Sequence, residues 1–187
     1  MSAGVFEGAR TKIDRAREQT QTLQAEFQTF IDSKPYAVPQ ILDEKTRRKT
    51  ATYKITESFP LRWSAMIGEI LHDLRSALDN TIYEMTCIEQ GGPLKQTEFP
   101  VFDDESEYDR MTKKGDPAPG SGVFKIRGIN NRAKALFRLL QPFEFKKTYP
   151  SPNDQHILGL LHELNIVDKH RTIHLCRVRT KDFGLRS

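Results

Sequence analysis

Hydrophobic residues recur at three- and four-residue intervals along four stretches of this 187-residue chain. The widest stripe runs from Leu61 to about Glu89 and predicts a central helix that other elements contact on more than one side. A narrower stripe from Val5 to about Ile31 predicts a long amphipathic helix that ends at Lys34-Pro35. Two further helices are expected, from Asn130 to Pro142 and from about residue 154 to 171.

Between Pro35 and Pro60 the pattern changes to short segments rich in β-branched residues, which predict a β-hairpin or small sheet. The tail IHLCRVRT alternates in the same way, so we expect the chain to return to this sheet. The fold class is therefore mainly α, a four-helix antiparallel bundle with a small β element, in a single domain over residues 1–187. Within it, GDPAPGSG at 115–122 has linker composition and predicts a flexible surface loop.

Composition narrows the class of protein further. A hydrophobic content of 37% is enough to bury one core without disulfides. Cys87 and Cys176 lie far apart, which is typical of reduced thiols. No apolar run of signal-peptide length and no run of eighteen apolar residues occurs, so we expect a soluble cytoplasmic protein without a membrane partner.

Charge is distributed unevenly. Residues 1–124 hold 16 Lys and Arg against 20 Asp and Glu, whereas residues 125–187 hold 13 against 5, a net charge of +8. This asymmetry fits an electrostatic footprint for nucleic acid, and equally a basic sector that pairs with the acidic one. Aromatic residues interleaved with the basic ones either stack on single-stranded nucleic acid or belong to the core. They are Phe124, Phe137, Phe143, Phe145 and Tyr149.

The stretch HDLRSALDN at 72–80 places polar side chains along one flank of the central helix. The members of this band are related by steps of three and four, and Arg75 can pair with Asp79. They are His72, Arg75, Ser76, Asp79, Asn80 and Tyr83. One interpretation is a solvated flank with ordinary salt bridges, and the other is a site.

A second polar band lies in LHELNIVDKHRTIH, where His162, Asn165 and Lys169 again step by three and four. If the two helices pack side by side, Arg75 and Asp79 can meet this band in a shared cluster. Only His170 and His174 have the spacing that two helical metal ligands need, and no HExxH motif is present, so we expect neither a metal nor a cofactor.

The two bands also carry a resemblance. HDLRSALDNTIYEM and LLHELNIVDKHR resemble an uncharacterised bacterial group, common in actinobacteria, with an LRSALDH helix and a later LNxxDKHR helix. FPVF at 99–102 and QPF at 141–143 fall where that group has similar short segments. The resemblance covers about residues 60 to 175.

The first motif is also similar to the signature of the HEPN superfamily. Its ribonucleases carry an Arg, then four to six residues later a His, on a core helix of an α bundle, and two protomers bring these residues together to cleave RNA without a metal. In this sequence the Arg corresponds to Arg75, and the His position holds Asn80. An amide cannot exchange protons near neutral pH, so the resemblance implies the fold more than the catalysis.

These observations lead to one leading function and two alternatives. The leading one is a HEPN-like bacterial or prophage module, a homodimer with a defence context, that binds RNA or another nucleic acid through its basic C-terminal third without efficient catalysis. The alternatives are a protein-interaction or regulatory module with purely structural polar clusters, and a metal-independent ribonuclease with a rearranged site. The candidate catalytic residues are Arg75, Asp79, Asn80 and His72, and the candidate nucleic-acid-binding residues are Asn165, Lys169, His170, Arg171, Arg177 and Arg179.

Overall fold

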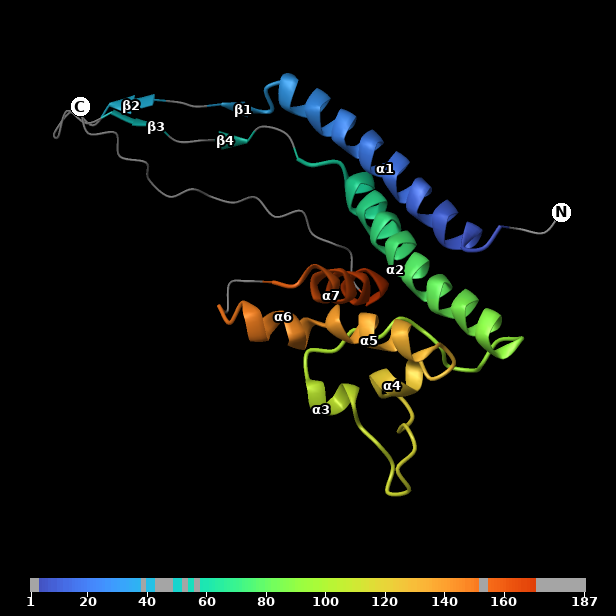
Figure 1. Ribbon diagram of the computed structural model, residues 1–187. Coiled ribbons are helices and arrows are strands. Elements are labelled where there is room, and N and C mark those ends of the chain that lie inside the picture. Colours follow the sequence, from blue (N-terminus) through green and yellow to red (C-terminus); the bar gives the residue numbers. More distant parts are fainter. Residues whose placement is uncertain are drawn as a thin grey trace.

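The computed structural model describes residues 4–37, 40–42, 49–51, 54–55, 58–151 and 155–170 (Figure 1). In this part the protein is mainly α-helical, as predicted. Its seven helices are α1 (Glu7–Asp32), α2 (Leu61–Gln90), α3 (Glu105–Tyr108), α4 (Gly122–Lys125), α5 (Asn131–Leu139), α6 (Pro142–Thr148) and α7 (Ile157–His170).

Four short strands lie between α1 and α2 in the sequence. They are β1 (Tyr36–Ala37), β2 (Gln40–Leu42), β3 (Lys49–Ala51) and β4 (Lys54–Ile55). β1 pairs with β4 and β2 with β3, both antiparallel. The predicted strand in the tail lies outside the described residues.

The two long helices α1 and α2 run antiparallel and side by side, and α7 packs against α2 as well (Figure 1). α1 buries small residues, Ala9 and Ala16, which allow the two helices to approach closely. α2 begins directly after Pro60 and ends where Gly91 adopts a left-handed φ of 71°. The prediction of a central helix contacted on more than one side is confirmed.

The hydrophobic core lies between α2 and the short helices that follow it. Its buried members are Ile82, Phe99, Tyr108, Ile126, Ile129, Phe137 and Phe143. Phe137 and Phe143 are therefore core residues, the second of the two interpretations offered for the aromatic residues. Tyr149 is exposed, and its ring centroid lies 4.7 Å from that of Phe145.

The C-terminal half contains more helices than the sequence pattern predicts. Pro142 was expected to close a helix, but it also begins α6, because a proline is tolerated in the first turn, where its missing N–H has no partner to lose. The four-residue helix α4 has no counterpart among the predicted helices. The four predicted helices correspond to α1, α2, α5 and α7, and three short helices accompany them in the described chain.

Gln141 ties the two short segments FPVF and QPF together. Its side chain is fully buried, and its Nε2 donates to the carbonyl oxygen of Pro100 at 3.0 Å. Its Oε1 accepts from the backbone N–H of Phe102 at 3.1 Å. The 99–102 segment is therefore fixed beside α2 without belonging to a sheet.

The 115–122 segment is anchored at its C-terminal end. Ser121 is completely buried and its hydroxyl caps α4 by accepting from the N–H of Phe124, and Ala118 is only 4% exposed. Flexibility of the rest of this segment stays a prediction.

Candidate functional site

A glycine on α2 allows α7 to approach closely. A Cβ atom added at Gly68 would lie 2.2 Å from Asp168 Oδ1, far inside contact distance. Asp168 therefore rests directly on the α2 backbone, and the two polar bands of the sequence face each other. We call the facing side chains of α2 and α7 the polar seam. It comprises His72, Arg75, Asp79, His162, Asn165, Asp168 and Lys169.

Arg75 occupies one end of the polar seam and is only 7% exposed. Its Nη2 donates to Asp79 Oδ1 at 2.9 Å and to the carbonyl oxygen of Phe99 at 2.6 Å. The Phe99 N–H also donates to Asp79 Oδ1, at 2.9 Å. This closed set of bonds fastens the segment after α2 onto the helix. Arg75 Nη1 is buried and has no hydrogen-bond partner among the described residues.

His162 of α7 faces this end of the seam. Burial lowers the pKa of its imidazole, and the positive charges of Arg75 and Lys125 lower it further. Its Nδ1 is buried and has no partner in the described part of the chain. The imidazole is therefore neutral at neutral pH.

Two carboxylates lie beside His162 and Arg75. Burial raises the pKa of Asp79, against the opposing charge of Arg75. Burial alone would raise the pKa of Glu98. The Lys125 ammonium, 2.7 Å from its carboxylate, has the larger effect, so the pKa of Glu98 is lowered. This end of the seam holds groups of both signs that largely satisfy one another.

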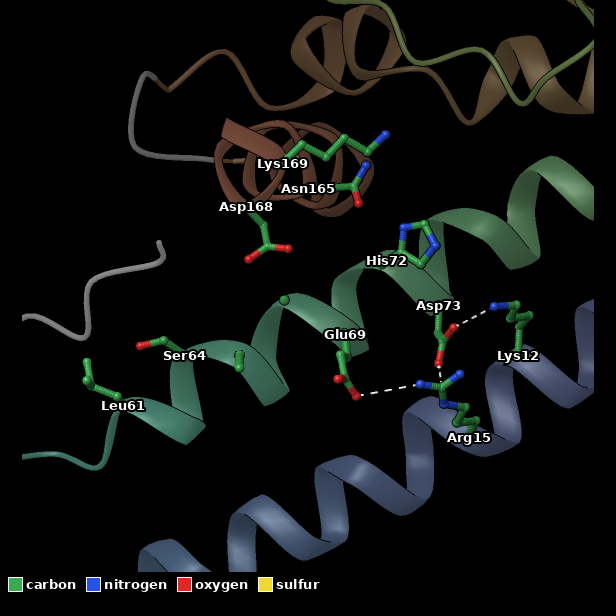
Figure 2. A pocket seen from close by; sticks show the side chains of 12 residues that line it. Lys12, Arg15, Leu61, Ser64, Glu69, His72, Asp73, Asn165, Asp168 and Lys169 are labelled. Carbon is green, nitrogen blue, oxygen red and sulfur yellow. Dashed lines mark hydrogen bonds and ion pairs between the residues drawn. The ribbon is translucent and has the colours of Figure 1, made fainter. Parts of the chain in front are cut away.

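The other end of the seam opens into a cavity of about 770 Å³ between α1, α2 and α7 (Figure 2). Asp73 forms part of its wall and is 1% exposed. Two residues of α1 hold its carboxylate, with Lys12 Nζ 2.8 Å from Oδ1 and Arg15 Nε 3.2 Å from Oδ2. These ion pairs fix α1 against α2.

The predicted catalytic residues do not gather in one place. Arg75 and Asp79 face α7, whereas Asn80 lies on the α1 side of α2, where a Cβ on Gly8 would be 3.6 Å from its Nδ2. His72 is exposed at the cavity edge, with its Nε2 3.4 Å from Ser76 Oγ.

Two of the predicted nucleic-acid-binding residues, Asn165 and Lys169, line the cavity. His170 is the last residue of α7, and its side chain lies outside the described residues. So do Arg171, Arg177 and Arg179.

The sequence left several seam residues unassigned. His162 belongs to the second band at visible helical spacing, but only the fold places it beside Arg75. Lys125 and Glu98 come from outside both bands, and no local pattern marks them. Asp73 has its partners about sixty residues away on α1, so no local spacing identifies its role.

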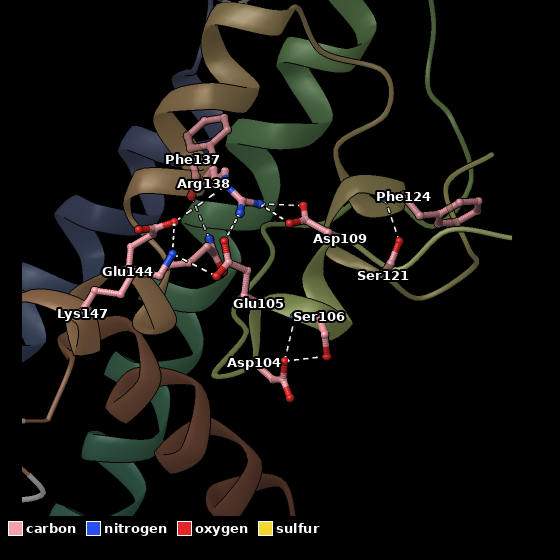
Figure 3. A network of polar contacts seen from close by, with 11 residues as sticks. Asp104, Glu105, Ser106, Asp109, Ser121, Phe124, Phe137, Arg138, Glu144 and Lys147 are labelled. Atoms are coloured by element: carbon pink, nitrogen blue, oxygen red, sulfur yellow. Dashed lines mark hydrogen bonds and ion pairs between the residues drawn. The ribbon is translucent and has the colours of Figure 1, made fainter. Parts of the chain in front are cut away.

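The basic C-terminal third is partly neutralised by the acidic segment around α3 (Figure 3). Arg138 Nη1 lies 2.6 Å from Asp109 Oδ1, and Arg138 also contacts Glu105. Lys147 Nζ lies 2.9 Å from Glu105 Oε2. The hydrogen bond to Asp109 raises the pKa of the Arg138 guanidinium above its ordinary value. This pairing supports the second interpretation of the charge asymmetry for these cations.

No protein-family model, curated protein or solved structure matches this chain. In the part of the chain that the structure describes, no helix is long and apolar enough to cross a membrane. The described residues also contain no group of three His, Cys, Asp or Glu side chains placed to hold a metal ion.

Proposed function

We propose that the protein is a HEPN-like helical module that binds RNA or another nucleic acid, without efficient catalysis, and that the polar seam contacts the nucleic acid. One observation carries the proposal. The two segments that bear the resemblance lie far apart in the sequence, yet their polar side chains face each other and border a cavity of about 770 Å³.

Charge supports nucleic acid as the ligand. Lys169 is exposed at the rim of the cavity. The sequence beyond α7 adds five Lys and Arg residues, at 171, 177, 179, 181 and 186, against one acidic residue, Asp182. Phosphate contacts by such cations supply most of the affinity of non-specific nucleic-acid binding.

The geometry argues against efficient cleavage. Arg75 is buried, and its Nη2 is bonded to Asp79 and Phe99, so it has little access to a scissile phosphate. Asn80, at the position of the HEPN histidine, lies on the α1 side of the helix. A rearranged ribonuclease would have to use His162, the histidine that lies beside Arg75.

The test is the affinity for a short single-stranded RNA, measured by fluorescence anisotropy over a series of salt concentrations. We expect binding at low salt that weakens with a log–log slope of about −2, which corresponds to three phosphate contacts at roughly −0.7 each. A folded protein that binds no RNA even at the lowest salt would contradict the proposal.

A protein-interaction or regulatory module is the second candidate. It is favoured by the internal pairing of the seam, where Asp73 and Arg75 both have charged partners within the chain. Under this alternative the polar clusters only fix helix register, and no RNA binding is expected.

A further inference from the structure

We propose that the cavity between α1, α2 and α7 binds one nucleotide of the RNA, with a guanine base inside it and the phosphate at Lys169. The inference rests on the proposed function, because it names the ligand of the same seam. It is carried by polar groups that the protein buries at this cavity without giving them partners.

Asn165 and Ser64 are the two such groups. Asn165 is 3% exposed and Ser64 is 6% exposed, and both line the cavity. Neither side chain has a hydrogen bond in the described part of the chain. Figure 2 shows Asn165 projecting from α7 toward α2 beside His72. Neither is among the described residues whose polar atoms are sealed from solvent without a partner, so their polar atoms face the cavity, where a ligand can bond to them.

Asp168 selects the kind of base. A Cβ on Gly68 would lie 2.2 Å from its Oδ1 and 2.5 Å from both Cγ and Oδ2. Both oxygens lie over the glycine, and neither has a hydrogen bond or ion pair in the described part of the chain, so both can accept. Two adjacent acceptors match two adjacent N–H donors, and guanine presents such a pair on its N1 and N2.

Asn165 lies one helical turn before Asp168 and complements it. Its amide can donate to guanine O6, which is next to N1 on the same edge of the base. Adenine presents a single amino group there and an acceptor at N1, which would face the Asp168 carboxylate. The pair therefore favours guanine over adenine.

The rest of the cavity suits a nucleotide. Its volume of about 770 Å³ is typical of small-molecule sites. Ala65 presents a small apolar surface of α2 to the face of a base, and the exposed His72 ring at the edge can stack on it. Lys169 is exposed at the rim and supplies a cation for the phosphate.

The experiment compares two single-stranded RNAs of about ten nucleotides, all uridine except for a central G or a central A. By fluorescence anisotropy, we expect the G oligonucleotide to bind about tenfold more tightly, as a bidentate base contact provides. Asp168→Asn should abolish this preference, because an amide offers one acceptor and one donor. Glu163→Gln is the matched control, on the exposed side of the same helix, and should keep the preference.

Equal affinity for the two oligonucleotides, or a preference that survives Asp168→Asn, would overturn the inference while leaving RNA binding in place. Titration of 5′-GMP alone, followed by NMR, separates the two proposals. Saturable GMP binding that Asp168→Asn removes, in a protein that binds neither oligonucleotide, would support the cavity as a guanine site and overturn the proposed function.

Discussion

At the scale of single residues, Arg75 is more than a member of a surface salt bridge. An exposed Arg–Asp pair on a helix contributes about 0.3–0.5 kcal/mol. Arg75 is buried, however, and it bonds Asp79 and the Phe99 carbonyl at once. Its main role in this geometry is to hold the 99–102 segment against α2.

Replacing Arg75 with alanine should therefore destabilise the protein. We expect the free energy of unfolding to fall by about 2–3 kcal/mol, because the Phe99 carbonyl loses a charged donor and Asp79 loses its cation. The expected loss of stability is smaller than for a fully buried ion pair, because the Asp79 side chain is 35% exposed and water can solvate its carboxylate. Urea unfolding measures it, with Arg132→Ala on the exposed face of α5 as control. Equal stability of both variants would show that Arg75 is not structural.

His162 should make stability depend on pH. Its folded pKa lies below the unfolded value of about 6.5, mainly because of burial. The unfolded state therefore binds more protons between these two values, and the free energy of unfolding falls as the pH drops through that window. His156, whose pKa is also lowered by burial, acts in the same direction.

The variant His162→Gln should reduce this pH dependence. Urea unfolding at about pH 7.5 and pH 5.5 would show a smaller loss of stability in the variant than in the wild type, since glutamine does not titrate. An identical loss in both proteins would mean that His162 is not desolvated as the structure places it.

At the scale of elements, the contact between α2 and α7 depends on Gly68. A methyl group there would overlap the Asp168 carboxylate and push α7 away. We expect Gly68→Ala to lower the free energy of unfolding by about 1–3 kcal/mol, even though alanine is the better helix former by about 1 kcal/mol.

Gly159→Ala is the matched control for this prediction. Its Cβ would lie 3.6 Å from Pro142 Cγ, an ordinary contact, so helix propensity decides and stability should hold or rise. The sign of the change separates the two variants in urea unfolding. A stabilising Gly68→Ala would mean that α7 does not rest on α2 at this point.

Hydrophobic periodicity predicts the long helices well and the short ones poorly. The stripe from Leu61 onward places α2 to within a residue at each end, since thirty residues give a strong helical period and Gly91 a clear stop. α4 has four residues, too few to show any period. A proline is compatible with the end of one helix and with the first turn of the next. Pro142 therefore does not reveal by itself that α6 begins there, after the turn at Gln141.

The candidate site was predictable only as two separate bands. Steps of three and four identify His162 and Asn165 as neighbours on one face, and the same rule joins Arg75 to Asp79. Helical spacing does not show which face of α2 contacts which face of α7. That contact depends on Gly68, where the absence of a side chain leaves room for Asp168. A single sequence does not show that pairing.

At the scale of the whole molecule, part of the charge asymmetry is neutralised within the fold. Four described cations of the C-terminal third, at positions 125, 138, 146 and 147, are paired with carboxylates of the chain. These ion pairs connect α4, α5 and α6 to the segments before and around α3. In the described part of this third, Arg127, Arg132, Lys134 and Lys169 have no carboxylate partner, and of these Lys169 lies at the polar seam. Under the proposed function, binding should centre on the seam and on the basic sequence after α7.

The salt dependence of RNA binding in two lysine variants tests this account most directly. Lys169→Ala removes a cation at the rim of the seam, whereas Lys146→Ala removes one on α6 that pairs with Asp103, 2.9 Å away. For a short single-stranded RNA, Lys169→Ala should weaken binding and make the log–log salt slope shallower by about 0.7, with Lys146→Ala close to wild type. Equal slopes for both variants and the wild type would contradict binding at the seam.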